Sequence, residues 1–129
     1  MIVNFWSSSH SNQYKIDTVT FPENKKWELS LVNFIAVFRN PITHTGIYEL
    51  STNMIERDDG NIPRTICYIF LKSDSSYVNF TPTQKLHYKL RFHDLSATVF
   101  KFRSLATSEI IYFSEVAFQI EIRETYGRF

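Results

Sequence analysis

The side chains best suited to metal binding or acid–base chemistry are four histidines, which are spread along the chain: His10, His44, His87 and His93. A zinc site needs three or four ligands that converge on one point. His87 and His93 are six positions apart on one face of an expected strand, which separates them by about 20 Å. They cannot share one ion, so the sequence predicts no metal site.

The single cysteine, Cys67, is the one candidate thiol nucleophile. Without a second cysteine, the chain forms no internal disulfide and no cysteine-based zinc site. Cys67 lies in the apolar run Ile66–Leu71, and free cysteine is among the most buried residue types. A nucleophilic role would need an activating base, and the sequence identifies none. We therefore interpret Cys67 as a small buried hydrophobic residue.

Carboxylate catalysis needs two acidic groups held in one cleft. The adjacent pair Asp58 and Asp59 precedes Gly60, a combination that is typical of a turn. The chain has only three glycines, too few for a glycine-rich phosphate loop, and it lacks the nucleophile-elbow pattern of hydrolases. The sequence thus predicts no catalytic residue and no cofactor, and we expect a protein that is not an enzyme.

A basic face is the main candidate for binding. The segment Leu86–Phe92 alternates between apolar and basic or histidine side chains, and a neighbouring strand is expected to add two more cations. The residues of this face are His87, Lys89, Arg91, His93, Lys101 and Arg103. Such a face with nearby aromatic rings can bind single-stranded nucleic acid. The alternatives are a solvated face paired with glutamates, or a contact with another subunit. The net charge of +1 favours the solvated face.

The end of the chain offers a second candidate, which contains Tyr126, Arg128 and Phe129. Two aromatic residues around an arginine would suit a tail that docks on a partner. The same residues would equally suit packing onto their own domain, and the sequence leaves both interpretations open.

Strands must position all of these side chains. Aromatic residues make up 16% of the chain, with twelve Phe and seven Tyr, and this composition favours sheet. Turn signals recur at short intervals, as is typical of sandwiches and barrels. We expect one all-β domain over residues 1–129, a single antiparallel β-sandwich that is jelly-roll-like, with an immunoglobulin-like topology as the alternative. Trp6 and Trp27 are assigned to its core.

The longest expected strand is Trp27–Phe38. Its first half places Leu29 and Leu31 inward, while Glu28 and Ser30 alternate with them and face outward. The alternation then breaks at residues 33–35. The break predicts either a β-bulge or a strand that passes from one sheet to the other.

Three further segments set the expected layout. Asp58–Asn61 predicts a tight hairpin turn, and Thr65–Leu71 is the strand that follows it. The uninterrupted apolar character of Thr65–Leu71 predicts a central strand covered on both faces. Glu115–Arg123 alternates cleanly and is expected to be the last strand.

The order of several segments resembles a known family. An alternating strand and a turn precede a W-E-x-x-L strand, in the segments Tyr14–Ile16, Val19–Phe21 and Trp27–Phe34, and the closing segment is Phe118–Ile122, followed by Gly127 and Phe129. This order resembles that of small structural proteins encoded by Polinton/Maverick-type virus-like elements and related DNA viruses. The resemblance implies a β-sandwich that assembles into a virion, capsid vertex or appendage. It implies no catalytic residues.

We therefore expect a non-enzymatic structural protein, a homo-oligomerising β-sandwich subunit of a virus-like particle, whose partners are its own copies or other structural subunits. The alternatives are a β-domain that binds single-stranded nucleic acid, and a β-module that binds a ligand or glycan. Residues 1–6 lack the features of a signal peptide, and no apolar run reaches the roughly 20 residues of a membrane span. The expected location is cytoplasmic, nuclear or in a virion.

Overall fold

The computed structural model describes residues 1–7, 15–16, 25–55, 64–91, 95 and 98–125. In these ranges the chain forms the strands β1 (Ile2–Ser7), β2 (Lys15–Ile16), β3 (Trp27–Phe38), β4 (Gly46–Thr52), β5 (Arg64–Leu71), β6 (Tyr77–Phe80), β7 (Tyr88–Lys89), β8 (Phe100–Ser104) and β9 (Phe113–Glu124).

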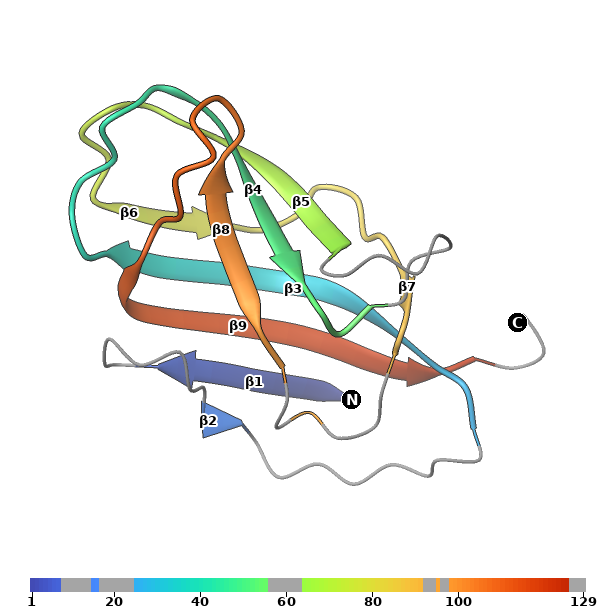
Figure 1. The fold of residues 1–129 in the computed structure, drawn as a ribbon. Helices are drawn as coiled ribbons and strands as arrows, with labels where there is room; N and C mark the ends of the chain where they lie inside the picture. Colours follow the sequence, from blue (N-terminus) through green and yellow to red (C-terminus); the bar gives the residue numbers. More distant parts are fainter. Residues whose placement is uncertain (8–14, 17–24, 56–63, 92–94, 96–97, 126–129) are drawn as a thin grey trace.

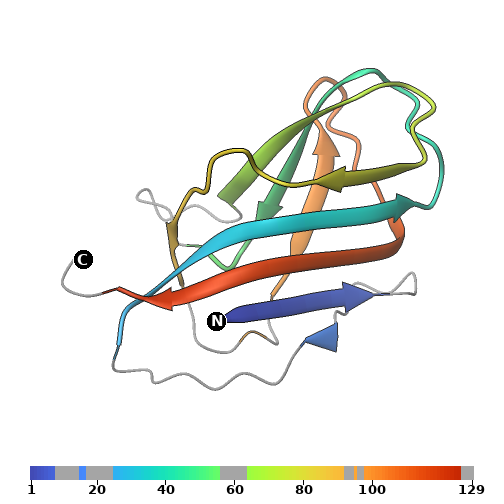
Figure 2. The same cartoon turned by 180° about the vertical axis from the view of Figure 1, so that it is seen from behind.

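The strands build two antiparallel sheets that pack together (Figure 1). The larger sheet has the order β2-β1-β9-β3-β6, and the short strand β7 also pairs with β3. The smaller sheet has the order β5-β4-β8. Seen from behind, β3 and β9 form the long central pair of the larger sheet (Figure 2). The predicted all-β sandwich is confirmed.

Phenylalanine side chains fill the space between the sheets. Phe118 of β9 stacks on Phe34 of β3 with ring centroids 4.9 Å apart. It also stacks on Phe100 of the smaller sheet, with ring centroids 3.9 Å apart. Phe102 packs against Phe34 and Phe38 as well. Much of the aromatic content therefore serves the core, because burying large rings removes the most apolar surface from water.

A β-bulge in β3 explains the break in its alternation. The register against β9 shifts between Leu31 and Asn33, so β3 stays in the larger sheet and only its phase changes. Before the bulge Leu29 and Leu31 face the core, and after it Phe34 does so. Ile35 and Val37, which follow the bulge, consequently face outward. Of the two explanations predicted for the break, the structure shows the bulge and not the strand that passes between sheets.

The position of β5 in its sheet differs from the prediction. It was expected in the centre of a sheet, but it is the edge strand of the smaller sheet and pairs only with β4 among the described strands. Its outward-facing Tyr68 and Phe70 are 57% and 62% exposed. A continuous apolar run arises either from two buried faces or from one buried and one exposed apolar face, and β5 has the second arrangement. The ladder with β4 ends at the pair Thr52 and Arg64, and the expected turn at 58–61 lies outside the described residues.

The expected strand over residues 86–92 is also much shorter. Only Tyr88 and Lys89 form β7, and Leu90 makes an isolated bridge to Ile55. Both β6 and β7 pair with β3, at Phe34↔Phe80 and at Leu29↔Tyr88. Between these two register pairs, residues 81–87 run alongside residues 30–33 of β3, so the first segment is longer than the second. The longer segment must bulge away from β3, and Leu86 becomes exposed instead of facing the core.

Candidate functional site

The expected basic face is divided between the two sheets. Lys89 lies on β7, which pairs with β3 in the larger sheet. Lys101 and Arg103 lie on β8, which pairs with β4 in the smaller sheet. The segment between β7 and β8 passes from one sheet to the other, so these consecutive strands are not neighbours. The prediction that Lys101 and Arg103 lie on a strand next to that of Lys89 is therefore wrong.

Two side chains of the expected face lie beside buried carboxylates. Arg103 donates from Nε to Glu49 at 2.9 Å, and Thr65 donates to the other oxygen of Glu49 at 2.7 Å. His87 lies 3.8 Å from Glu28, to which Arg123 also donates. These contacts place Arg103 and His87 in ion-pair networks within the fold.

Glu28 and Ser30 were expected to face outward from β3, and they do alternate with the core residues Leu29 and Leu31, but both are buried. Lys85, from the bulged segment, reaches Glu121 of β9 at 2.8 Å. Because Glu121 is the register partner of Ser30, this ion pair crosses above Ser30. The Lys85 ammonium lowers the pKa of Glu121.

Of the remaining candidate binding residues, the structure describes only Arg91. Arg91 is exposed, and its backbone N–H donates to Met54. His93 and the proposed tail residues Tyr126, Arg128 and Phe129 lie outside the described residues. Within the part of the chain that the structure describes, no three His, Cys, Asp or Glu side chains gather to hold a metal ion.

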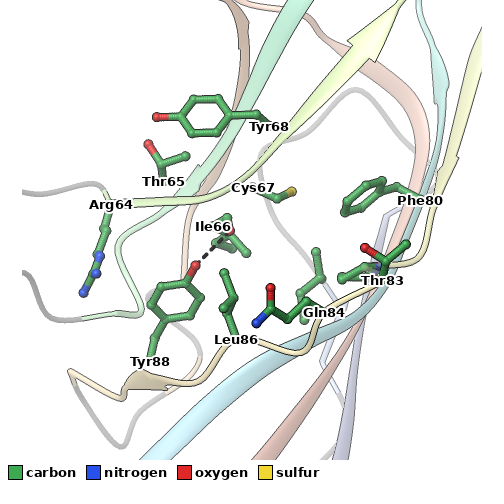
Figure 3. A pocket seen from close by; sticks show the side chains of 12 residues that line it. Arg64, Thr65, Ile66, Cys67, Tyr68, Phe80, Thr83, Gln84, Leu86 and Tyr88 are labelled. Carbon is green, nitrogen blue, oxygen red and sulfur yellow. Dashed lines mark hydrogen bonds between the residues drawn. The ribbon is translucent and has the colours of Figure 1, made fainter.

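A groove runs beside β5, and we call it the β5 groove. Its volume is about 450 Å³, which is within the range of ligand pockets. One wall is the first half of β5, the other is the bulged segment 81–87 with its flanking residues, and Leu31 also lines it (Figure 3). It is lined by Leu31, Arg64, Thr65, Ile66, Cys67, Tyr68, Phe80, Pro82, Thr83, Gln84, Leu86 and Tyr88.

Three groups give the β5 groove its polar character. Tyr88 donates its hydroxyl to the carbonyl of Ile66 at 3.0 Å, across the groove (Figure 3). The guanidinium of Arg64 lies 4.9 Å from the centre of the Tyr88 ring. Burial raises the pKa of Cys67 to about 12, so this side chain is a neutral thiol at physiological pH and a poor nucleophile.

A second feature is an exposed apolar surface on the larger sheet, the outer apolar patch, made of Trp6, Ile35, Val37, Tyr77 and Ala117. These residues are neighbours by register: Ala117 pairs with both Trp6 and Ile35, and Val37 pairs with Tyr77. Trp6 is 38% exposed and Ile35 42%, so the assignment of Trp6 to the core is wrong. A hollow of about 240 Å³ lies among Trp6, Ile35, Val37 and Ala117.

The bulge in β3 creates this patch, since it turns Ile35 and Val37 outward. The sequence carried the signal, because the alternation breaks before these residues. Which face they take after the break depends on the exact position of the inserted residue. That position follows from pairing with β9, which the sequence of β3 alone does not encode.

No protein-family model, curated protein or solved structure matches this chain. The described residues contain no helix with the length and apolar character that crossing a membrane requires.

Proposed function

We propose that this protein is a non-catalytic structural subunit that associates with copies of itself through the outer apolar patch. The observation that carries the proposal is the cluster of exposed apolar side chains across neighbouring strands of one sheet face. Single exposed apolar residues are ordinary on protein surfaces, whereas contiguous patches mark interaction sites. Tryptophan and tyrosine at such a patch are the residue types that contribute most to interfaces.

A second copy is the partner that the shape favours. The patch combines the large, partly exposed Trp6 ring with a hollow that Trp6 lines together with the small side chain of Ala117. An apolar surface that carries both large side chains and a hollow can meet its own copy across a two-fold axis, where each copy contributes to filling the hollow of the other. Glu115 at the rim stays at the edge of such a contact, where charge is tolerated.

The strand order supports a jelly-roll interpretation of the sandwich. If β6 and β7 count as one interrupted strand that pairs with β3, the larger sheet has the order second, first, last, third and sixth among the described strands. The smaller sheet interleaves the fifth, fourth and seventh. Pairing of the first strand with the last is typical of two Greek keys wound into a jelly roll. Such subunits build capsids, which agrees with the resemblance to Polinton/Maverick-type structural proteins.

Nucleic-acid binding receives less support. The expected basic face is split between two sheets, and Arg103 and His87 pair with glutamates. A continuous positive track along which a strand could run is therefore not formed by these residues.

The test compares two matched substitutions by sedimentation velocity over a concentration series. Ile35→Lys places a charge in the outer apolar patch. Ile47→Lys places the same charge at a similarly exposed strand position, 49% exposed, on the smaller sheet. We expect wild type and Ile47→Lys to associate and Ile35→Lys to remain monomeric. A wild-type monomer at all concentrations, or equal behaviour of the two variants, would contradict the proposal.

A further inference from the structure

The bulged segment 81–87 lies against the larger sheet without backbone pairing. Within the described part of the chain, none of its backbone N–H or carbonyl groups takes part in a backbone hydrogen bond. Its two ends are fixed, because Phe80 belongs to β6 and Tyr88 to β7, and both strands pair with β3. A segment without backbone hydrogen bonds can separate from the sheet while the strands on either side of it stay paired.

Polar side chains attach this segment to the sheet. Near its start, Asn33 donates its side-chain N–H to the Thr81 hydroxyl at 3.0 Å. At its end, His87 lies 3.8 Å from a buried glutamate of β3. Between these points, Lys85 forms its 2.8 Å ion pair with Glu121 of β9. The Lys85 and Glu121 side chains keep 45% and 26% of their surface exposed, so water and salt weaken this attachment.

The closed position of the segment has a cost at Ser30. Its side chain lies beneath the Lys85–Glu121 ion pair and is 1% exposed. The Ser30 hydroxyl has no hydrogen-bond partner among the described residues. A buried hydroxyl without a partner destabilises the state that buries it, and water can reach this hydroxyl once Lys85 withdraws. The ion pair therefore favours the closed position, and Ser30 opposes it.

We propose that the bulged segment 81–87 is a flap, latched by the Lys85–Glu121 ion pair, that opens while both sheets stay folded. Opening moves Thr83, Gln84 and Leu86, which lie on one wall of the β5 groove (Figure 3), and so widens the groove. It also uncovers the outer face of β3 beneath the ion pair. Because the latch is an exposed ion pair, ionic strength controls the open population. The flap is separate from self-association, since no residue of 81–87 belongs to the outer apolar patch.

The test is cleavage of the folded chain by thermolysin, a protease that cuts before large apolar residues. An open flap presents the bond between Lys85 and Leu86, and mass spectrometry identifies the resulting fragments 1–85 and 86–129. The cleavage rate follows the open population when the flap recloses faster than it is cut. Global unfolding exposes far more surface than flap opening and depends steeply on urea. We expect cleavage at this bond at low urea concentrations, with a rate that changes little with urea.

Two variants remove the latch from opposite sides. Lys85→Met and Glu121→Gln should each speed this cleavage about two- to fivefold. In about 1 M sodium chloride the ratio of variant to wild-type rates should approach one, because salt already weakens the latch in the wild type. The matched control is Lys25→Met, which removes an ion pair of similar exposure with Glu124, also on β9 but away from the flap. It should leave the cleavage rate unchanged.

The Ser30→Ala variant should change the rate in the opposite direction. It removes the hydroxyl that opposes closure and should slow cleavage about fivefold. Three outcomes would overturn the proposal: cleavage at this bond only where the whole domain unfolds, equal acceleration by Lys25→Met and Lys85→Met, or unchanged or faster cleavage of Ser30→Ala. None of these outcomes bears on self-association through the outer apolar patch, which is read from sedimentation.

Discussion

Phe118 joins the two sheets, and replacing it should be the most damaging single change in the core. The ring is fully buried and stacks on both Phe34 of its own sheet and Phe100 of the other. Phe118→Ala removes the whole ring from a close-packed interior, which costs about 3–5 kcal/mol in free energy of unfolding. Each stacked ring pair accounts for about 0.5–1.5 kcal/mol of this loss in the free energy of unfolding.

The assay is urea unfolding followed by tryptophan fluorescence and circular dichroism in the Ile35→Lys background, since association raises apparent stability. In thermal unfolding followed by the same signals, a domain of this size loses about 3–6 °C in melting temperature per kcal/mol, so Phe118→Ala should melt about 10–30 °C lower. The control is Tyr112→Ala, an exposed ring 5.2 Å from the Arg39 guanidinium, which should cost no more than about 1 kcal/mol. Equal losses in both variants would refute this account of the core.

Two further predictions concern the groove walls. Because burial raises the pKa of Cys67 to about 12, the folded thiol should react with iodoacetamide at pH 8 about a thousandfold more slowly than in urea. Above pH 9 the unfolded chain releases this proton while the folded chain keeps it, so stability should fall by about 1.4 kcal/mol per pH unit up to pH 12. Cys67→Ala should remove that part of the decline, and an unchanged slope would argue against the burial of the thiol. The amide of Asn33 donates to Asn79, to the carbonyl of Phe80 and to Thr81, at the point where β6 leaves β3. Asn33→Ala should cost about 1 kcal/mol and speed hydrogen exchange of residues 80–86, whereas Asn79→Ala removes one contact and should do less.

Local sequence patterns were sufficient for the fold class and for most strands. Trp27–Phe38 and Glu115–Arg123 alternate over long stretches, and they became β3 and most of β9. The break in β3 was visible because inward and outward positions exchange there, and the pairing with β9 identifies it as a bulge. These features depend on residues close in the sequence, which is why periodicity reveals them.

The errors arise where pairing between segments that are distant in the sequence determines the place of a strand in its sheet. The edge position of β5 depends on which strands flank it, and its apolar run is the same in the centre or at the edge. The cations of β7 and β8 alternate as expected, but the sheet each strand joins is fixed by partners elsewhere in the chain. The β5 groove depends on a mismatch in length between residues 81–87 and 30–33. No residue type marks such a mismatch in the sequence.

Self-association through the outer apolar patch is the central claim, and light scattering of the purified wild-type chain over a wide concentration range tests it most directly. The account predicts a discrete dimer, which Ile35→Lys converts to monomer. A wild-type mass that stays at the 15.3 kDa of one chain at every concentration would contradict it.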